Sequence, residues 1–152
     1  MSKITLLQNY DSPILLENHS EGWVYKISEK YVAKVETPKE FPTYNIDMFY
    51  EIKMARLLYS FGISVPEPIT CDYVRVDNEV KKGFIMEFID GKSFHHDMST
   101  DDRNLAESML GYEREKCYEK GFTVEYEDME WILTKDKTIK LIDFTKWKYK
   151  GL

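Results

Sequence analysis

The stretch "YVAKV" at residues 31–35 sets one lysine, Lys34, inside an otherwise apolar run of strand-forming residues. Successive side chains of a strand point to opposite faces, so Lys34 faces either solvent or a partner within the protein. Lysine is rarely buried unless it is paired with an acid. The stretch therefore predicts a strand and leaves open whether its lysine is solvated.

The next part of the chain offers an acidic partner. From about residue 45 to residue 61, apolar residues recur at helical spacing, and Gly62 is suited to end such a helix. Glu51 lies near its middle, where it faces either solvent or the strand. A strand lysine oriented by a helix glutamate is an arrangement that holds the α- and β-phosphates of a nucleotide.

An aspartate near the end of the chain suggests a cation. "WILT" (131–134) and "TIKLIDF" (138–144) predict a hairpin, and Asp143 follows its second apolar run. A carboxylate buried there is costly unless it is paired or binds a cation, and magnesium prefers hard oxygen ligands. We expect Lys34 and Asp143 to face each other across one crevice.

The remaining segments predict an α+β fold. Further strands are indicated at 22–27, 71–77 and 83–89, with turns at 28–30 and 78–82. A second helix is predicted from a cap at Ser99 or Thr100 to about Lys120, where Gly121 ends it. We expect one domain over 1–152. Its N-terminal lobe (about 1–89) would be a five-stranded antiparallel sheet with one helix, and its C-terminal lobe (90–152) a reduced helical part with a small hairpin.

Composition excludes some classes of function. The net charge of −6 argues against a nucleic-acid binder, which needs a basic face. Cys71 and Cys117 stand far apart and predict free thiols in a reducing compartment. The sequence shows no secretion signal and no apolar run of the length that a membrane span needs, so we expect a cytoplasmic protein.

Taken together, five motifs resemble those of the protein-kinase-like superfamily, in order, from about Leu15 to Trp147. The resemblance is closest to the RIO and KEOPS-associated kinases and the aminoglycoside phosphotransferases. The motifs are "VAKV" (32–35), the helix "YEIKMARLLYSF" (50–61), its exit "GISVPEPI" (62–69), "GFIMEFIDGKSF" (83–94) and "KLIDFT" (140–145).

This resemblance implies an ATP- and magnesium-binding phosphotransferase, similar to serine/threonine kinases, that acts on a hydroxyl of a protein or small molecule. Lys34 would contact the phosphates, Glu51 would pair with it, and Asp143 would bind magnesium. The other implied nucleotide contacts are Gly22 in the phosphate loop, Val24 and Ala33 over the base, Met86 as gatekeeper, and the Glu87 carbonyl and Ile89 amide at the adenine edge.

The glycine-rich loop departs from the family pattern. It keeps only Gly22, while Glu17 and His19 stand at other glycine positions and Glu21 adds a repelling charge. Fewer glycines allow fewer backbone N–H groups to approach phosphate, so nucleotide binding is expected to be weak.

The catalytic loop departs further. An ungapped alignment sets Val124, Tyr126 and Trp131 where the family has histidine, aspartate and asparagine. A shift of one or two residues would bring Glu127 or Asp128 to the hydroxyl, and we take Asp128 as the candidate base; the alternative is a solvated acidic turn. A pseudokinase, a nucleotide-binding or regulatory module without catalysis, is therefore the alternative function. A third possibility is a structural interaction protein without a ligand, in which a pair of Lys34 and Glu51 only stabilises the lobe.

The last residues allow two interpretations. Lys146, Lys148 and Lys150 alternate with Trp147 and Tyr149. This pattern indicates either a solvated tail strand, which we favour, or a surface that recruits a protein partner or a second copy to complete the reduced lobe. His95 and His96 are adjacent in a predicted loop, and no role is assigned to them.

Overall fold

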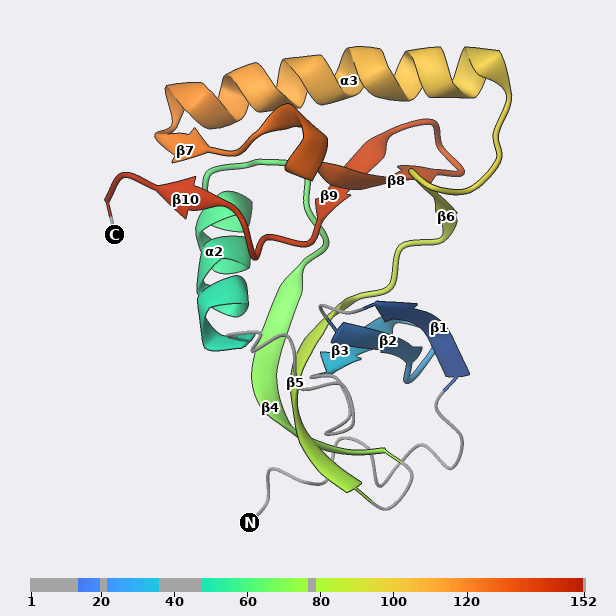
Figure 1. Cartoon of the computed structure of the whole chain (residues 1–152), viewed down its shortest axis with the longest axis vertical. Helices are drawn as coiled ribbons and strands as arrows, with labels where there is room; N and C mark the ends of the chain where they lie inside the picture. Colours follow the sequence, from blue (N-terminus) through green and yellow to red (C-terminus); the bar gives the residue numbers. More distant parts are fainter. Residues whose placement is uncertain (1–13, 20–21, 36–47, 77–78, 152) are drawn as a thin grey trace. The chain divides into compact units, whose positions relative to one another are not determined.

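The structure is a computed structural model that describes residues 14–19, 22–35, 48–76 and 79–151 (Figure 1). The chain divides into two compact units. Unit 1 comprises Met1–Ile52 and Pro68–Phe88, and unit 2 comprises Lys53–Glu67 and Ile89–Leu152. The break after Phe88 lies next to residue 89, where the sequence analysis sets the lobe boundary, and the segment Lys53–Glu67 is grouped with the C-terminal residues.

Unit 1 is built on an antiparallel sheet with strand order β1-β2-β3-β5-β4. Together with the helices described below, this sheet confirms the α+β class. The strands are β1 (Ile14–His19), β2 (Gly22–Lys26), β3 (Tyr31–Val35), β4 (Pro68–Val76) and β5 (Glu79–Glu87).

The connections within this sheet are partly those that the sequence predicts. The Ser28 hydroxyl accepts hydrogen bonds from the N–H groups of Lys30 and Tyr31, at 3.1 and 3.0 Å, which closes the predicted turn between β2 and β3. The charged turn predicted at 78–82 is wrong for residues 79–82, which belong to β5. Val80 of β5 is exposed and pairs with Arg75 of the outer strand β4. Charged residues in the sequence next to Val80 are therefore compatible with a strand that has one face in solvent.

Helix α2 (Met48–Ser60) matches the predicted helix over its described residues, and Gly62 follows it with a positive φ of 77°. Its buried residues include Ile52, Ala55 and Leu58, as the helical spacing predicts. Phe49 differs, because it is 56% exposed, and the Lys82 ammonium lies 5.5 Å from the centre of its ring.

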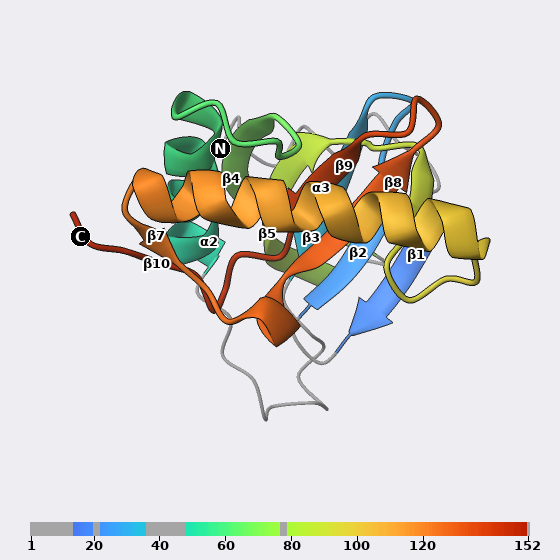
Figure 2. The ribbon, with the colours of Figure 1, turned by 90° about the horizontal axis from the view of Figure 1, so that it is seen from above.

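Unit 2 holds a three-stranded sheet in the order β6-β8-β9 and a two-stranded ribbon of β7 and β10. Helix α3 lies along this unit and contacts β7 and β9 (Figures 1 and 2). The elements are β6 (Gly91–Ser93), α3 (Thr100–Glu119), β7 (Phe122–Thr123), the 3₁₀ turn η2 (Tyr126–Asp128), β8 (Glu130–Thr134), β9 (Ile139–Ile142) and β10 (Lys148–Tyr149).

Both ends of α3 confirm the sequence prediction. The Ser99 hydroxyl caps the helix by accepting a hydrogen bond from the Asp102 N–H at 3.1 Å, and Gly121 follows it with a φ of 96°. The helix buries Ala106, Leu110 and Cys117. Burial raises the pKa of the Cys117 thiol to about 12, and this thiol is free, as predicted.

Ser64, which follows α2 in the chain, holds the outer strand β9. Its carbonyl accepts a hydrogen bond from the Leu141 N–H at 2.8 Å, and its hydroxyl donates to the Ile139 carbonyl at 2.6 Å. The Ser64 N–H in turn points to Glu113 Oε2 of α3 at 3.5 Å. One loop residue therefore joins the helix and the sheet of unit 2.

The C-terminal segment is not a solvated tail, so the favoured interpretation is wrong. Trp147 is fully buried and packs edge-on against the Phe144 ring, with the ring centres 5.6 Å apart. Lys148 pairs with Thr123 of β7, and its side chain is exposed. The alternation in the sequence thus separates the buried Trp147 and the half-buried Tyr149 from exposed lysines.

Candidate functional site

Lys34 and Glu51 form a buried ion pair within unit 1. Lys34 Nζ lies 3.0 Å from Glu51 Oε1 and donates a hydrogen bond to Oε2 at 3.1 Å. The two residues are 5% and 1% exposed. The solvated alternative is therefore wrong for both residues, while their roles toward a nucleotide stay predictions.

The register of the sheet defines the surface on which Lys34 lies. Directly opposed residues of antiparallel strands share a face, and Lys34 is opposed by Val24 of β2 and Phe84 of β5. Val32, two residues before Lys34, is on the same face and is opposed by Met86. An apolar surface of Val24, Val32 and Met86 thus accompanies the lysine.

Ala33 lies on the opposite face from Lys34. It pairs with Tyr25 and Ile85 and belongs with them to a buried apolar cluster. Sequence reasoning chose Ala33 as a cover for the base, but the residue on the face of the lysine is Val32. The alternation of the strand was sufficient to find Val32, because residues i and i+2 share a face.

The expected adenine contacts lie where β5 ends. Met86 is buried near the end of this strand, and Glu87 is its last residue. The Phe88 N–H donates a hydrogen bond to the Lys30 carbonyl at 2.7 Å, which fixes the backbone next to Glu87. Ile89 is half-buried and is the first residue after the break that ends unit 1.

The phosphate loop is described only in part. Gly22 begins β2 and pairs with His19, the last residue of β1, while Glu17 pairs with Val24. Glu21 lies outside the described residues. The expected contact between Gly22 and phosphate stays a prediction.

Asp143 directly follows β9 and has a positive φ of 58°. Its Oδ1 accepts a hydrogen bond from the Thr145 hydroxyl at 3.0 Å, and the residue is half-buried, not buried as its position in the sequence suggests. Such a backbone costs a non-glycine residue free energy, and conformations of this kind cluster at functional sites.

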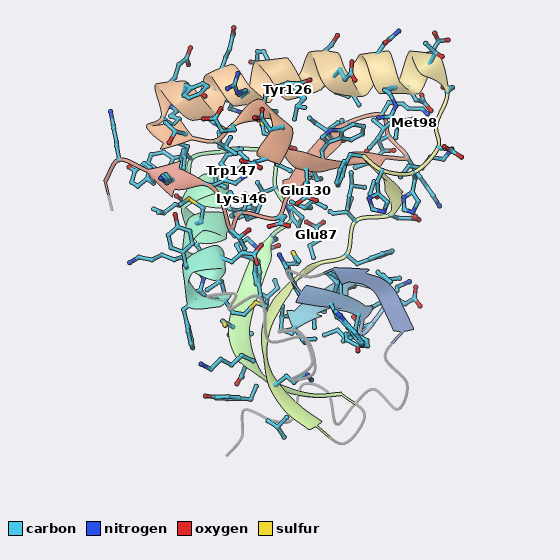
Figure 3. All side chains as sticks on the ribbon, in the orientation of Figure 1. Glu87, Met98, Tyr126, Glu130, Lys146 and Trp147 are labelled. Carbon is cyan, nitrogen blue, oxygen red and sulfur yellow. The ribbon has the colours of Figure 1, made fainter. Side chains whose placement is uncertain are left out.

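The candidate base Asp128 closes the 3₁₀ turn η2. Its Oδ1 lies 3.4 Å from the ammonium of Lys146, and both side chains are partly exposed. Its neighbours Glu125 and Glu127 are exposed, as the alternative of a solvated acidic turn predicts. Figure 3 labels Lys146 and Tyr126 of this region.

The residues that the ungapped alignment sets in the catalytic loop have no suitable chemistry or position. Val124 is buried, and Trp131 is buried inside β8. Trp131 also has no acceptor atom for a metal.

Glu130 is a further acid close to the turn η2, and the structure places it in a strand. It opens β8 and pairs with Ile142, the residue before Asp143. The two carboxylates therefore stand at the same end of the β8–β9 hairpin. Counting residues outward from the turn at 135–137 would have identified this register.

No prebuilt metal centre is found among the described residues, where no three His, Cys, Asp or Glu side chains are grouped to hold an ion. His95 and His96 instead surround the buried Ser93, whose hydroxyl lies 3.0 and 2.9 Å from their respective Nδ1 atoms. A magnesium ion at Asp143 would thus take most of its ligands from phosphate and water, as this ion commonly does.

The fold of the chain is protein-kinase-like. Among solved structures, it is similar to the kinase PK-1 of the Cydia pomonella granulovirus, with 14% sequence identity and a TM-score of 0.57. The match covers 97% of this chain and 55% of that kinase, so the chain spans little more than half of its length. This likeness shows the fold alone.

Two other comparisons find no match. No family model matches the chain, and no curated protein matches it. In the part of the chain that the structure describes, no helix is both long and apolar enough to cross a membrane.

Proposed function

We propose that the chain is an ATP- and magnesium-binding phosphotransferase with a reduced helical lobe, which transfers a γ-phosphoryl group to a hydroxyl of a protein or small molecule. One observation carries the proposal: the buried Lys34–Glu51 ion pair between a strand and a helix of a kinase-like fold. Burying two charges is costly, and apolar residues of similar volume are often as stable. A function that needs the ammonium in a fixed place explains why the pair is present.

The face of β3 that carries Lys34 supports a place for the nucleotide. Lys34 would contact the phosphates, held in position by Glu51, and Val24, Val32 and Met86 would offer an apolar surface to the base. When bound, ATP with magnesium supplies the phosphoryl group and neutralises its charge. Asp143 offers a carboxylate to the ion, and Asp128 would accept the proton of the hydroxyl.

The sequence motifs place this activity nearest to the RIO and KEOPS-associated kinases and the aminoglycoside phosphotransferases. This subfamily, like serine/threonine specificity, belongs to the proposal. The motifs alone support it.

A second candidate is a pseudokinase that binds nucleotide without catalysis. It is favoured by one specific feature, the catalytic loop. Trp131 occupies a buried strand position, and the carboxylate of Asp128 is engaged by Lys146.

The test begins with nucleotide binding, followed as the shift in thermal unfolding with ATP and magnesium. A ligand at a hundred times its dissociation constant adds about 2.7 kcal/mol to stability. Because Lys34→Ala alone would leave a buried charge without its partner, the variant of choice is Lys34→Met with Glu51→Leu, which replaces the pair by apolar groups. The exposed Lys92→Met is the matched control.

Turnover then separates the two candidates. We expect ATP binding that the double variant loses and the Lys92→Met control keeps, together with ADP formation that Asp143→Asn abolishes. Binding without ADP formation selects the pseudokinase. Absence of any shift at millimolar ATP contradicts both.

A further inference from the structure

The loop between β6 and α3 places two adjacent histidines around one buried hydroxyl group. Ser93, the last residue of β6, is 4% exposed. Its Oγ lies 3.0 Å from His95 Nδ1 and 2.9 Å from His96 Nδ1. Both histidines are exposed to solvent, and the centres of their rings lie 4.5 Å apart. The proposed phosphoryl transfer does not use these side chains, so their arrangement needs a separate explanation.

The hydrogen bonds of Ser93 identify the protonation state of His96. A backbone N–H can only donate, and the Ser93 N–H donates to His96 Nδ1 at 3.2 Å. This nitrogen is therefore an acceptor, so His96 is neutral and carries its proton on Nε2. The Ser93 hydroxyl then donates to the same nitrogen and accepts from His95, whose Nδ1 and Nε2 lie 3.0 and 3.4 Å from the oxygen. His96 Nδ1 thus accepts from two donors of one buried residue.

The backbone around His96 is held by groups that do not titrate near neutral pH. Arg103 of α3 donates to the Phe94 carbonyl at 3.3 Å and to the His96 carbonyl at 3.2 Å. The Phe94 N–H donates to the Trp131 carbonyl of β8 at 2.9 Å, and the His96 N–H donates to the Ser93 carbonyl, also at 2.9 Å. The loop therefore joins the first turns of α3 to the three-stranded sheet of unit 2.

The charged groups around His96 do not favour a second proton on its ring. On α3, the positive Arg103 is bonded to the His96 carbonyl, and the ring of His95 lies beside that of His96. The residues of β8 that pair with β6 are uncharged, and β6 itself carries the exposed Lys92. Asp97 is the one acid of the loop, and it is exposed to water, which weakens its attraction for a proton on His96.

We propose that Ser93, His95 and His96 form a pH-sensitive switch, which holds this loop on β6 at neutral pH and releases it as the pH falls. Imidazole takes up a proton between about pH 5 and pH 8. A proton on His96 Nδ1 removes the acceptor of the Ser93 N–H, and a buried donor without an acceptor is unfavourable. The released loop hydrates both rings and binds more protons, so by linkage its population rises as the pH falls. Release also breaks the contacts of Arg103, so acid loosens the attachment of α3 to the sheet.

Hydrogen exchange of the Ser93 amide, followed by NMR between about pH 5 and pH 8, tests the switch. Protection factors are compared, because they correct for the intrinsic dependence of exchange on pH. The test variant is His96→Asn, since the side-chain oxygen of asparagine can accept the Ser93 N–H and does not titrate. The matched control is His95→Asn, which changes the adjacent histidine and leaves His96 Nδ1 in place. The amide of Leu110, a buried residue of α3, reports the stability of the whole unit.

In the native chain, the protection factor of the Ser93 amide should fall about tenfold or more from the upper to the lower end of this range, and more steeply than that of Leu110. The His95→Asn variant should show a similar fall, whereas His96→Asn should keep its protection in acid. A native protection factor that stays constant while the His96 ring titrates, or that changes only in step with Leu110, overturns the proposal. Nitrogen NMR spectra that place the His96 proton on Nδ1 at about pH 8 also overturn it, as does an equal fall in a folded His96→Asn variant.

Discussion

Two lysine–carboxylate pairs, one in each unit, differ in almost every physical respect. Lys34 and Glu51 are buried, their atoms lie 3.0 Å apart, and both are held by regular elements, a strand and a helix. Lys146 and Asp128 are partly exposed, 3.4 Å apart, and both are held by turns. Burying the first pair costs free energy and fixes its side chains in place. The second pair costs little free energy to form, and its side chains can adjust their positions.

The difference indicates which part of the kinase-like pattern is retained. A buried charge is stable only while its partner remains, so the sequence around Lys34 and Glu51 has little freedom to change. Exposed ion pairs contribute little to stability, so residues around Asp128 can change without loss of the fold. The lysine–glutamate pair of the kinase-like pattern is therefore present in this chain, and the catalytic loop departs from the pattern.

The largest effect is expected when the buried pair is broken. Glu51→Ala leaves the Lys34 ammonium buried without its carboxylate, and should lower the free energy of unfolding by about 3–5 kcal/mol. Urea denaturation followed by tryptophan fluorescence and circular dichroism measures this loss.

The exposed Glu107→Ala is the control and should change stability by less than about 0.5 kcal/mol. The double variant Lys34→Met with Glu51→Leu should recover most of the loss, because no charge is then buried. If Glu51→Ala costs less than about 1 kcal/mol, the pair is more hydrated than its burial indicates.

An intermediate effect is expected at Asp143, where the backbone has a φ of 58°. Alanine is strained in this conformation and glycine is not, so Asp143→Ala should be less stable than Asp143→Gly by about 1 kcal/mol. Both variants lack the carboxylate and should lose magnesium-dependent ATP binding equally. Equal stability of the two, measured by urea denaturation, would mean that the backbone at residue 143 relaxes.

The smallest effect is expected at the exposed pair. Asp128→Asn removes the attraction to Lys146 and should cost at most about 1 kcal/mol at low salt. At about 0.5 M salt this difference should nearly vanish, because screening weakens exposed pairs. A loss above about 2 kcal/mol at either salt concentration would show that the two pairs are not different in kind.

The pairing of Lys34 with Glu51 could be predicted from the sequence because each charge interrupts an apolar, periodic segment. The ends of α3 could be predicted equally well, because Ser99 and Gly121 act through local backbone geometry. Such features depend on residues within a few positions of each other, or on a periodicity that the sequence displays directly.

Other features depend on contacts between distant segments, and the sequence alone did not reveal them. The burial of Trp147 depends on its contact with Phe144 and on the pairing of β10 with β7. This pairing involves two residues of each strand, too few for a recognisable pattern in the sequence. The position of Glu130 requires the register of the β8–β9 hairpin. The face on which Ala33 lies is a different case, because the alternation that assigns Val32 to the face of Lys34 was present in the sequence.

The bonds of Ser64 to β9 have a consequence for how the molecule resists aggregation. β9 lies at one edge of its sheet, and edge strands with available N–H and C=O groups can pair with strands of other molecules. Ser64 forms hydrogen bonds with the Leu141 N–H and the Ile139 carbonyl, so these two groups are not available to pair with another strand. Ser64 thus takes the hydrogen bonds that a further strand would otherwise form. It thereby protects the hairpin that precedes Asp143 from edge-to-edge pairing with other molecules.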